Sequence, residues 1–281
     1  MFPIFYESTR QDSFFYEDRD ITFPSHLHKQ FEIFYLKQGE AAIRLNQSRF
    51  ILQAGEMICI FPNDIHSYES IGDTCFYIGL IDPLRLGRNG AVLLENKCTA
   101  PVVSMEKLPK EVIGCMDTVA SVYKKGEIIT RNEWFYGYMN VIADCILRTI
   151  ALTPLKQNSN EDILHSVLNY ILCHYKEDIG LDHVARETGI SKYYLSKLFT
   201  NKIGCSFPEY LVTLRTEYGM ELLKEGKRSI REIGEICGFQ SETSFFRNFR
   251  RRVGMTPLQY RRLYGESLCQ SSGETEGRED E

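Results

Sequence analysis

The last third of the chain repeats one pattern twice, and this repeat limits the possible folds more than any other feature. Eight small, apolar or helix-capping positions recur at an offset of 49 or 50 residues. They are Ala185, Gly189, Ser191, Leu195, Phe199, Gly204, Ser206 and Tyr210, answered by Gly234, Gly238, Ser241, Phe245, Phe249, Gly254, Thr256 and Tyr260. In each copy a small residue precedes a glycine by four positions, and a serine then opens a short amphipathic helix. This order predicts two helix-turn-helix units, whose second helices would each lie in a major groove of DNA.

Helical periodicity surrounds these two units. The expected helices cover residues 161–176, 181–188, 191–202, 206–225, 229–237 and 241–253. Thr256 and Pro257 are residue types that begin a helix, and this last helix is expected to end near Gly265. Residues 266–281 are polar and acidic, which is typical of a disordered tail.

Charge is distributed unevenly along the 281 residues. The formal net charge is −5, yet residues 186–264 carry 15 Lys and Arg against 8 Asp and Glu. Residues 1–160 carry 16 basic against 19 acidic side chains, and residues 265–281 carry one Arg against six acids. A basic segment in an acidic protein is typical of a polyanion-binding surface, although a solvated helical surface would also explain it.

The first part of the chain has a different pattern. Residues 20–103 contain short alternating apolar runs separated by turn residues, which favours an antiparallel β-barrel or sandwich. Residues 109–125 and 132–152 then have helical periodicity. The second of these helices carries an apolar stripe, made of Trp134, Tyr138, Val141, Cys145 and Thr149. The predicted fold class is therefore α+β.

These patterns predict five segments. They are an antiparallel β-barrel at 1–103, a helical hairpin at 104–152, a linker at 153–160, the tandem helix-turn-helix domain at 161–265 and an acidic tail at 266–281. The linker is expected because residues 153–160 are polar and contain a proline.

Composition excludes several other classes of protein. No apolar run approaches the roughly 20 residues that cross a bilayer. The N-terminus lacks the basic start and the cleavage site of a signal peptide. The nine cysteines are never closer than sixteen positions apart, which excludes a CxxC redox or zinc motif and favours reduced thiols. We therefore expect a cytoplasmic protein without a membrane anchor or a bound cofactor.

Each predicted second helix has one apolar and one polar face. In the first unit Tyr193, Ser196 and Lys197 share the polar face, and in the second Glu242, Thr243 and Arg247 do so. Arg and Lys can donate to guanine edges, whereas Glu can accept from cytosine. Five further basic residues are expected to contact phosphates: Lys192, Lys202, Arg250, Arg251 and Arg252.

Two strings that contain these residues resemble sequences of a known family. The string GFQSETSFFRNFRRRVGMTPLQYRR combines a turn, a recognition helix and a helix cap, and a related string, GISKYYLSKLFTNKIGCSFPEYL, lies upstream. Residues 161–264 closely resemble the DNA-binding domain of AraC/XylS transcriptional regulators. The resemblance implies that the two units enter successive major grooves, and its base-reading positions fall on the six polar-face residues named above. Gly219 and Gly234 depart from the alanines usual there, and each costs the helix up to roughly 1 kcal/mol.

A second resemblance lies near the N-terminus. His26, His28, Glu32 and Gly39 have the spacing of the first cupin motif, and His66 follows Gly55 as in the second. Cupins use such residues to hold a divalent metal, and these ligand types suit iron, manganese, nickel or zinc. Phe61 stands where the second motif has proline, and Ser70 where it has asparagine. The resemblance implies a cupin-like effector-sensing barrel at 1–103. The regulator family commonly keeps this outline without metal, so we expect His26, His28, Glu32 and His66 to line an effector pocket, with metal binding or a plain scaffold as alternatives.

Three functions are compatible with these features. The first is a transcriptional regulator that is not an enzyme, in which the barrel binds a small molecule and the tandem units bind promoter DNA. By resemblance the helical hairpin forms a homodimer, with the alternative that its two helices cap the barrel of a monomer. By resemblance the regulator would activate by contacting RNA polymerase. The second is a metal-dependent cupin enzyme fused to a DNA-binding domain, and the third is an effector-independent DNA-binding protein. Aromatic side chains in the barrel suit stacking on a sugar, but equally a plain core.

Overall fold

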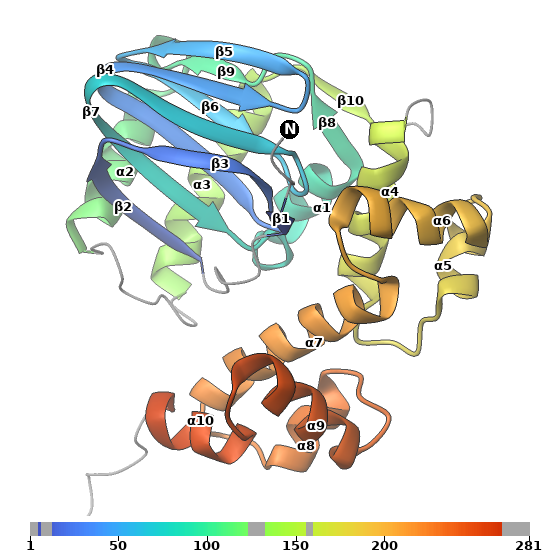
Figure 1. The fold of residues 1–281 in the computed structure, drawn as a ribbon. Helices are drawn as coiled ribbons and strands as arrows, with labels where there is room; N and C mark the ends of the chain where they lie inside the picture. The colour runs from blue at the N-terminus through green and yellow to red at the C-terminus, as the bar shows by residue number, and fades with distance from the viewer. Residues whose placement is uncertain (1–4, 7–12, 123–132, 156–159, 266–281) are drawn as a thin grey trace, which may run out of the picture. The chain divides into compact units, whose positions relative to one another are not determined.

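The computed structural model describes residues 5–6, 13–122, 133–155 and 160–265 (Figure 1). The chain divides into two compact units, residues 1–211 and residues 212–281, which are described separately. The predicted acidic tail lies outside the described residues. The five predicted segments remain a prediction, since the only boundary between compact units follows Leu211, inside the segment predicted at 161–265.

One antiparallel-rich sheet organises the first unit. Its eight strands are β1 (Phe5–Tyr6), β2 (Phe14–Arg19), β3 (Thr22–Leu27), β4 (Phe31–Leu45), β5 (Ser48–Gln53), β6 (Glu56–Ile60), β7 (His66–Ile81) and β9 (Val102–Ser104). Among the described strands the hydrogen-bonded path runs β1-β3-β7-β4-β6-β9, with β2 beside β7 and β5 beside β4. The predicted α+β class is confirmed. The predicted barrel is not closed by hydrogen bonds between β1 and β9, so the sheet has the character of a jelly roll or sandwich.

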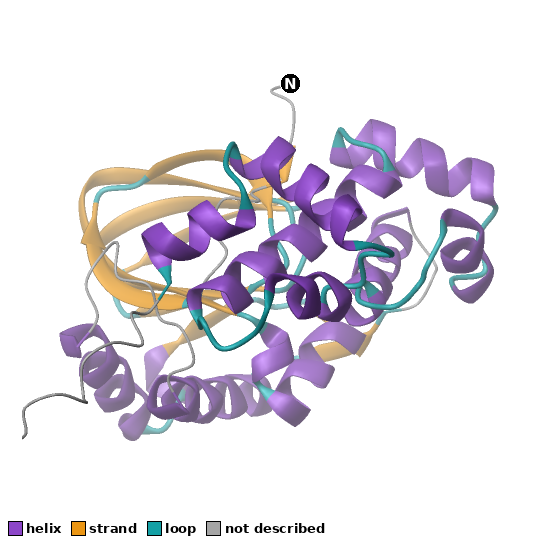
Figure 2. Cartoon of the chain, turned by 90° about the horizontal axis from the view of Figure 1, so that it is seen from below, coloured by secondary structure: helices purple, strands orange, loops and turns teal. Residues whose placement is uncertain are grey.

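The two longest strands give the sheet its curl. β4 and β7 pair along their length, and the register shifts around Gln38. Gly39 is required at this bend, because its φ is +88° and a Cβ there would lie 2.3 Å from the carbonyl oxygen of Asp73. One half of β4 pairs with β6 and the other with β5, which separates the strands into two layers (Figure 2).

Alternating side chains of these strands build two cores. One face carries Phe34, Leu36, Ile43, Phe76 and Ile78, which form an apolar core between the strands. The other face packs against α2 (Lys110–Val122) and α3 (Glu133–Thr149). The aromatic residues considered for sugar stacking are mostly buried in these cores: Phe31, Phe34, Phe61, Tyr68, Phe76 and Tyr77. Their burial favours a role in the hydrophobic core over stacking on a sugar.

Three elements of the first unit were not expected. Helix α1 (Gly87–Glu95) lies within the range predicted as strands. α3 ends at Thr149, and β10 (Leu152–Pro154) follows it and pairs with β8 (Asn96–Cys98). The stretch predicted as a linker from residue 153 therefore begins inside a strand.

The predicted C-terminal helices are all present (Figure 1). They are α4 (Asn160–His174), α5 (Leu181–Glu187), α6 (Lys192–Leu198) with a π-helical turn at Phe199–Ile203, α7 (Phe207–Lys224), α8 (Ile230–Ile236), α9 (Glu242–Val253) and α10 (Pro257–Tyr264). The boundary between the two compact units falls within α7. The first helix-turn-helix, α5–α6, therefore belongs to the first unit, and the second, α8–α9, to the second unit.

Phe245 organises the core of the second unit. It is fully buried together with Phe249, and it contacts Phe239 and Phe249 at ring-centroid distances of 5.2 and 5.5 Å. A Cβ at Gly219 would lie 3.1 Å from Cε2 of Phe245, and one at Gly234 would lie 3.2 Å from its Cβ. The phenylalanine therefore occupies the space that a methyl group at either glycine would need.

This contact predicts that the effects of two substitutions depend on each other. An alanine in a helix interior is favoured over glycine by about 1 kcal/mol, but at Gly219 contact with the Phe245 ring opposes that gain. Leucine lacks Cε2 and Cζ, so Gly219→Ala should stabilise the Phe245→Leu protein more than the wild type. A double-mutant cycle of urea unfolding measures this coupling. Strictly additive effects would contradict the assigned contact.

Candidate functional site

The first candidate recognition helix is α6. Gly189 adopts a φ of +69° in the turn before it, and the hydroxyl of Ser191 accepts a hydrogen bond from the backbone N–H of Tyr194. Leu195 is buried on one side of the helix. The predicted base-reading residues Tyr193, Ser196 and Lys197 are all exposed on the other.

The second candidate recognition helix, α9, repeats this arrangement. Gly238 has a φ of +86°, and Ser241 accepts a hydrogen bond from the backbone N–H of Ser244. The predicted base-reading residues Glu242, Thr243 and Arg247 are exposed. Phe246, next to Arg247, is partly buried against the core of the unit rather than exposed with them.

The five predicted phosphate contacts are also on the surface, but two of them have partners within the protein. Lys192, Lys202, Arg250, Arg251 and Arg252 are all exposed. Lys192 pairs with Asp182 at 2.7 Å, and Arg251 donates to the side-chain oxygen of Asn248 at 3.2 Å. DNA would compete with these contacts. Arg250 and Arg252 extend the basic surface of α9 beyond Arg247, which suits the phosphates beside a groove.

The four cupin-like residues meet in the first unit. His26 lies on β3, Glu32 on β4 and His66 on β7, and His28 lies just after β3. All four are buried, and one potential ligand atom from each lies within 4.8 Å of the others. We call this group the histidine–glutamate cluster.

Hydrogen bonds fix the carboxylate of Glu32. His28 Nε2 lies 2.8 Å from Oε2, and the Tyr68 hydroxyl donates to Oε1 at 2.5 Å. His66 Nε2 lies 3.3 Å from Oε2. Burial opposes ionisation, but the hydrogen bond with His28 and the nearby imidazole of His66 outweigh it and hold the pKa of Glu32 well below its ordinary value. The cluster therefore contains a buried carboxylate anion.

Two of the histidines have a defined orientation. Nδ1 of His26 lies 2.9 Å from the carbonyl oxygen of Pro24, and Nδ1 of His66 lies 2.9 Å from that of Asp64. Because a carbonyl oxygen can only accept, Nδ1 of each ring carries a proton. Burial, with the neighbouring His66 and His28, lowers the pKa of His26 to about 3. His26 is therefore neutral near pH 7, with the lone pair on Nε2.

The segment between β6 and β7 connects the cluster to α4. The backbone N–H of Asn63 donates to the carbonyl oxygen of His28 at 2.8 Å, and its side-chain amide donates to Oδ1 of Asn169 at 2.8 Å. Asp64 lies 3.5 Å from His165 Nε2. Asn169 also donates to the carbonyl oxygen of Leu94 at 2.6 Å. This segment lies within the range where the sequence predicted short strands separated by turn residues, and no spacing in it indicated the contacts with α4.

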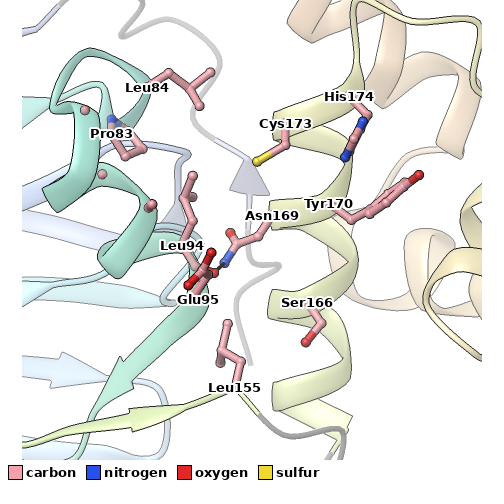
Figure 3. Close-up of a pocket in the computed structure, with 13 residues that line it drawn as sticks. Pro83, Leu84, Leu94, Glu95, Leu155, Ser166, Asn169, Tyr170, Cys173 and His174 are labelled. Atoms are coloured by element: carbon pink, nitrogen blue, oxygen red, sulfur yellow. Dashed lines mark hydrogen bonds between the residues drawn. The ribbon is translucent and has the colours of Figure 1, made fainter.

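A cavity of about 530 Å³ lies beside this connection, between α1 and α4 (Figure 3). Leu84, Leu94 and Leu155 give it an apolar lining, and Glu95 and Ser166 add polar groups. Its volume is within the usual range for small-molecule sites. The sequence did not predict it, because α1 was not expected.

Two family models match the chain. The model described as an AraC-like ligand binding domain matches residues 11–83, and the one described as a helix-turn-helix domain matches residues 184–263. Together they cover just over half of the chain. The chain belongs to the AraC family of transcriptional regulators.

This AraC-family protein has relatives that match most of its length. The HTH-type transcriptional activator RhaR of Shigella dysenteriae is 24% identical over 251 residues, covering 86% of this chain and 88% of RhaR. RhaR of Escherichia coli K12 is also 24% identical, over 254 residues. ToxT from Vibrio cholerae, a solved structure, is 14% identical, covers 90% of this chain and 99% of its own, and has a TM-score of 0.41. Both RhaR proteins are named transcriptional activators.

The matched ranges include the predicted sites of this AraC-family regulator. The histidine–glutamate cluster lies within the ligand-binding match, and all eleven predicted DNA contacts lie within the helix-turn-helix match. Among the described residues, no helix is both long enough and apolar enough to cross a membrane.

The Asn63–Asn169 connection generates a prediction. Asn169→Leu should destabilise the contact of α4 with the sheet domain, because it removes the partners of the Asn63 amide and the Leu94 carbonyl. An unpaired buried polar group costs about 1–3 kcal/mol. Amide hydrogen exchange should become faster in α4. Ser166→Ala, on the same helix, is the control and should leave exchange unchanged; equal rates in both variants would contradict the role of Asn169.

Proposed function

We propose that this regulator recognises promoter DNA through α6 and α9 and that a ligand in its sensor domain controls this binding. One observation carries the proposal. Both helix-turn-helix units bury the apolar side of their second helix and expose the polar residues predicted to read bases. The ligand-binding match before them supports control by an effector.

Different residues read the bases and bind the phosphates. Tyr193, Ser196 and Lys197 read bases in one major-groove segment, and Glu242, Thr243 and Arg247 do so in another. The five other basic residues neutralise phosphates and make the affinity depend steeply on salt. Tyr193 has 70% of its surface exposed, although a tyrosine ring is largely apolar. Contact with a base would bury this ring.

Activation is favoured over repression, because the relatives that match most of the chain are named transcriptional activators. An activator of this kind would contact RNA polymerase at the promoter and would act in the cytoplasm. The effector contacts the histidine–glutamate cluster, and the segment at 61–66 transmits its presence to α4. A coupling of roughly 1–3 kcal/mol is enough to switch occupancy of the DNA.

Dimerisation is assigned to α3. Phe135, Met139 and Ile142 face the core, but Trp134 and Val141 on the opposite side remain 41% and 51% exposed. Trp134 and Tyr138 are neighbours at a ring-centroid distance of 4.6 Å. A second copy of α3 covering this stripe would bury apolar surface and pair two DNA-binding domains.

Base-reading and phosphate-binding residues should respond differently to substitution. Arg247→Ala should relax the preference for particular sequences, with a loss of about 1–3 kcal/mol on the preferred site. Arg252→Ala should weaken binding to all sequences by a similar factor. Selection of bound fragments from a random DNA pool, followed by affinity measurements, separates these outcomes. A uniform loss in both variants would show that Arg247 does not read bases.

The dimer assignment has its own test. Val141→Glu should convert the purified protein to a monomer, because the new carboxylate would be desolvated within the apolar interface. Ile51→Glu, an equivalent change at an exposed position of β5, is the control and should leave the mass unchanged. Light scattering after size exclusion gives both masses. A dimer that survives Val141→Glu, or a monomeric wild type, would contradict the assignment.

A further inference from the structure

The cavity between α1 and α4 is separate from the histidine–glutamate cluster, because no residue of the cluster lines it. Its lining comes from α1 and the turn before it on one side and from α4 on the other (Figure 3). Apolar side chains form much of this lining: Pro83, Leu84, Ala91, Leu94 and Leu155. A volume of about 530 Å³ suits an organic molecule rather than a single ion.

The polar groups of the lining favour one sign of charge in a ligand. Among the described residues that line the cavity, Glu95 is the one acidic residue, and none is a lysine or an arginine. His174 also lines the cavity, but its Nδ1 lies 2.9 Å from the carboxylate of Glu177. The carboxylate of Glu95 has no hydrogen bond or ion pair with any described residue. The cavity therefore offers a carboxylate to a cation and no basic side chain to an anion.

Helix α1 contacts both α3 and α4. The side-chain amide of Asn89 on α1 donates to Oδ1 of Asn140 on α3 at 2.8 Å. At the other end of α1, the carbonyl oxygen of Leu94 accepts from the amide of Asn169 on α4 at 2.6 Å. A molecule in the cavity would contact α1 and α4 together, beside this second hydrogen bond. It would therefore strengthen the attachment of α4, the helix that precedes the first helix-turn-helix.

We propose that this cavity is a second ligand site, which takes an organic cation with an apolar body. The apolar body lies against the leucines of the lining, and the cationic group pairs with the carboxylate of Glu95, which is exposed at the edge of the cavity. Burial of apolar surface supplies most of the affinity, and the carboxylate supplies the selectivity for charge. The inference goes beyond the proposed function, because the site lies outside the histidine–glutamate cluster and its occupation does not require DNA.

Three probes of similar size and different charge test the site: phenylbutylamine, phenylbutanol and phenylbutyrate. Each is titrated into the full-length protein near neutral pH by isothermal titration calorimetry. The amine, which is then a cation, should bind at one equivalent per chain and roughly fivefold more tightly than the neutral alcohol. Phenylbutyrate should bind more weakly than the alcohol, because Glu95 repels it. No saturable binding of the amine, or equal affinity for the amine and the alcohol, would overturn the proposal.

Two substitutions test whether the probes bind in this cavity. Glu95→Gln should abolish the preference for the amine and leave the affinity for the alcohol unchanged. Ala91→Phe should weaken the binding of both by roughly tenfold or more, because the new ring occupies the cavity. Glu111→Gln, at an exposed carboxylate of α2, is the control and should bind as the wild type does.

Circular dichroism establishes that each variant is folded, and Glu95→Gln carries the test if Ala91→Phe is not. Unchanged affinity for the amine in either folded variant would contradict the assigned site.

Amide hydrogen exchange tests the effect of the ligand on α4. At a concentration of phenylbutylamine about ten times its dissociation constant, exchange in α4 should slow by about tenfold, because opening of this contact must release the ligand. Exchange in α9, which belongs to the other compact unit, is the internal control and should not change. Unchanged exchange in α4 with the amine bound would overturn the bridging role. Sequence-specific DNA binding by a protein that takes up no amine would reject this inference alone, whereas uptake of the amine without specific DNA binding would reject only the proposed function.

Discussion

The DNA-binding surface depends on the burial of one side of each recognition helix. Leu195 and Phe199 anchor α6, and Phe245 and Phe249 anchor α9; all four side chains are fully buried. A positive-φ glycine and a serine cap precede each helix and fix where it begins. Once the apolar side is fixed in this way, helical geometry determines which residues face outward. The positions available to read DNA are thus set by packing rather than by any contact among the polar residues themselves.

A similar constraint operates in the sensor domain, where strand alternation places a carboxylate inside the core. Glu32 lies on the same face of β4 as Phe34 and Leu36, so its burial follows from its position in the strand. The neighbouring imidazoles and the Tyr68 hydroxyl make this burial tolerable. Because His66 begins β7 and the 61–66 segment contacts α4, events in the cluster have a short physical route to the DNA-binding region.

The sequence predicted local and periodic features more successfully than features that depend on distant contacts. The repeat gave both helix-turn-helix units, and the spacing of His26, His28, Glu32 and His66 indicated that they would meet. Helix α1 was missed because it is short and lies among strands. The Asn63–Asn169 hydrogen bond joins residues 106 positions apart, and the cavity beside it needs both α1 and α4. The contact of Phe245 with Gly219 explains a departure from the family pattern that the sequence alone could only note.

The central claim is that two recognition helices give this chain a preference for particular DNA sequences. The most direct test is to recover and sequence the genomic fragments that the purified full-length protein binds at near-physiological salt. The account predicts enrichment of a few promoter regions that share a two-part motif, with one part for each helix-turn-helix unit. Fragments recovered in proportion to bulk DNA would contradict it.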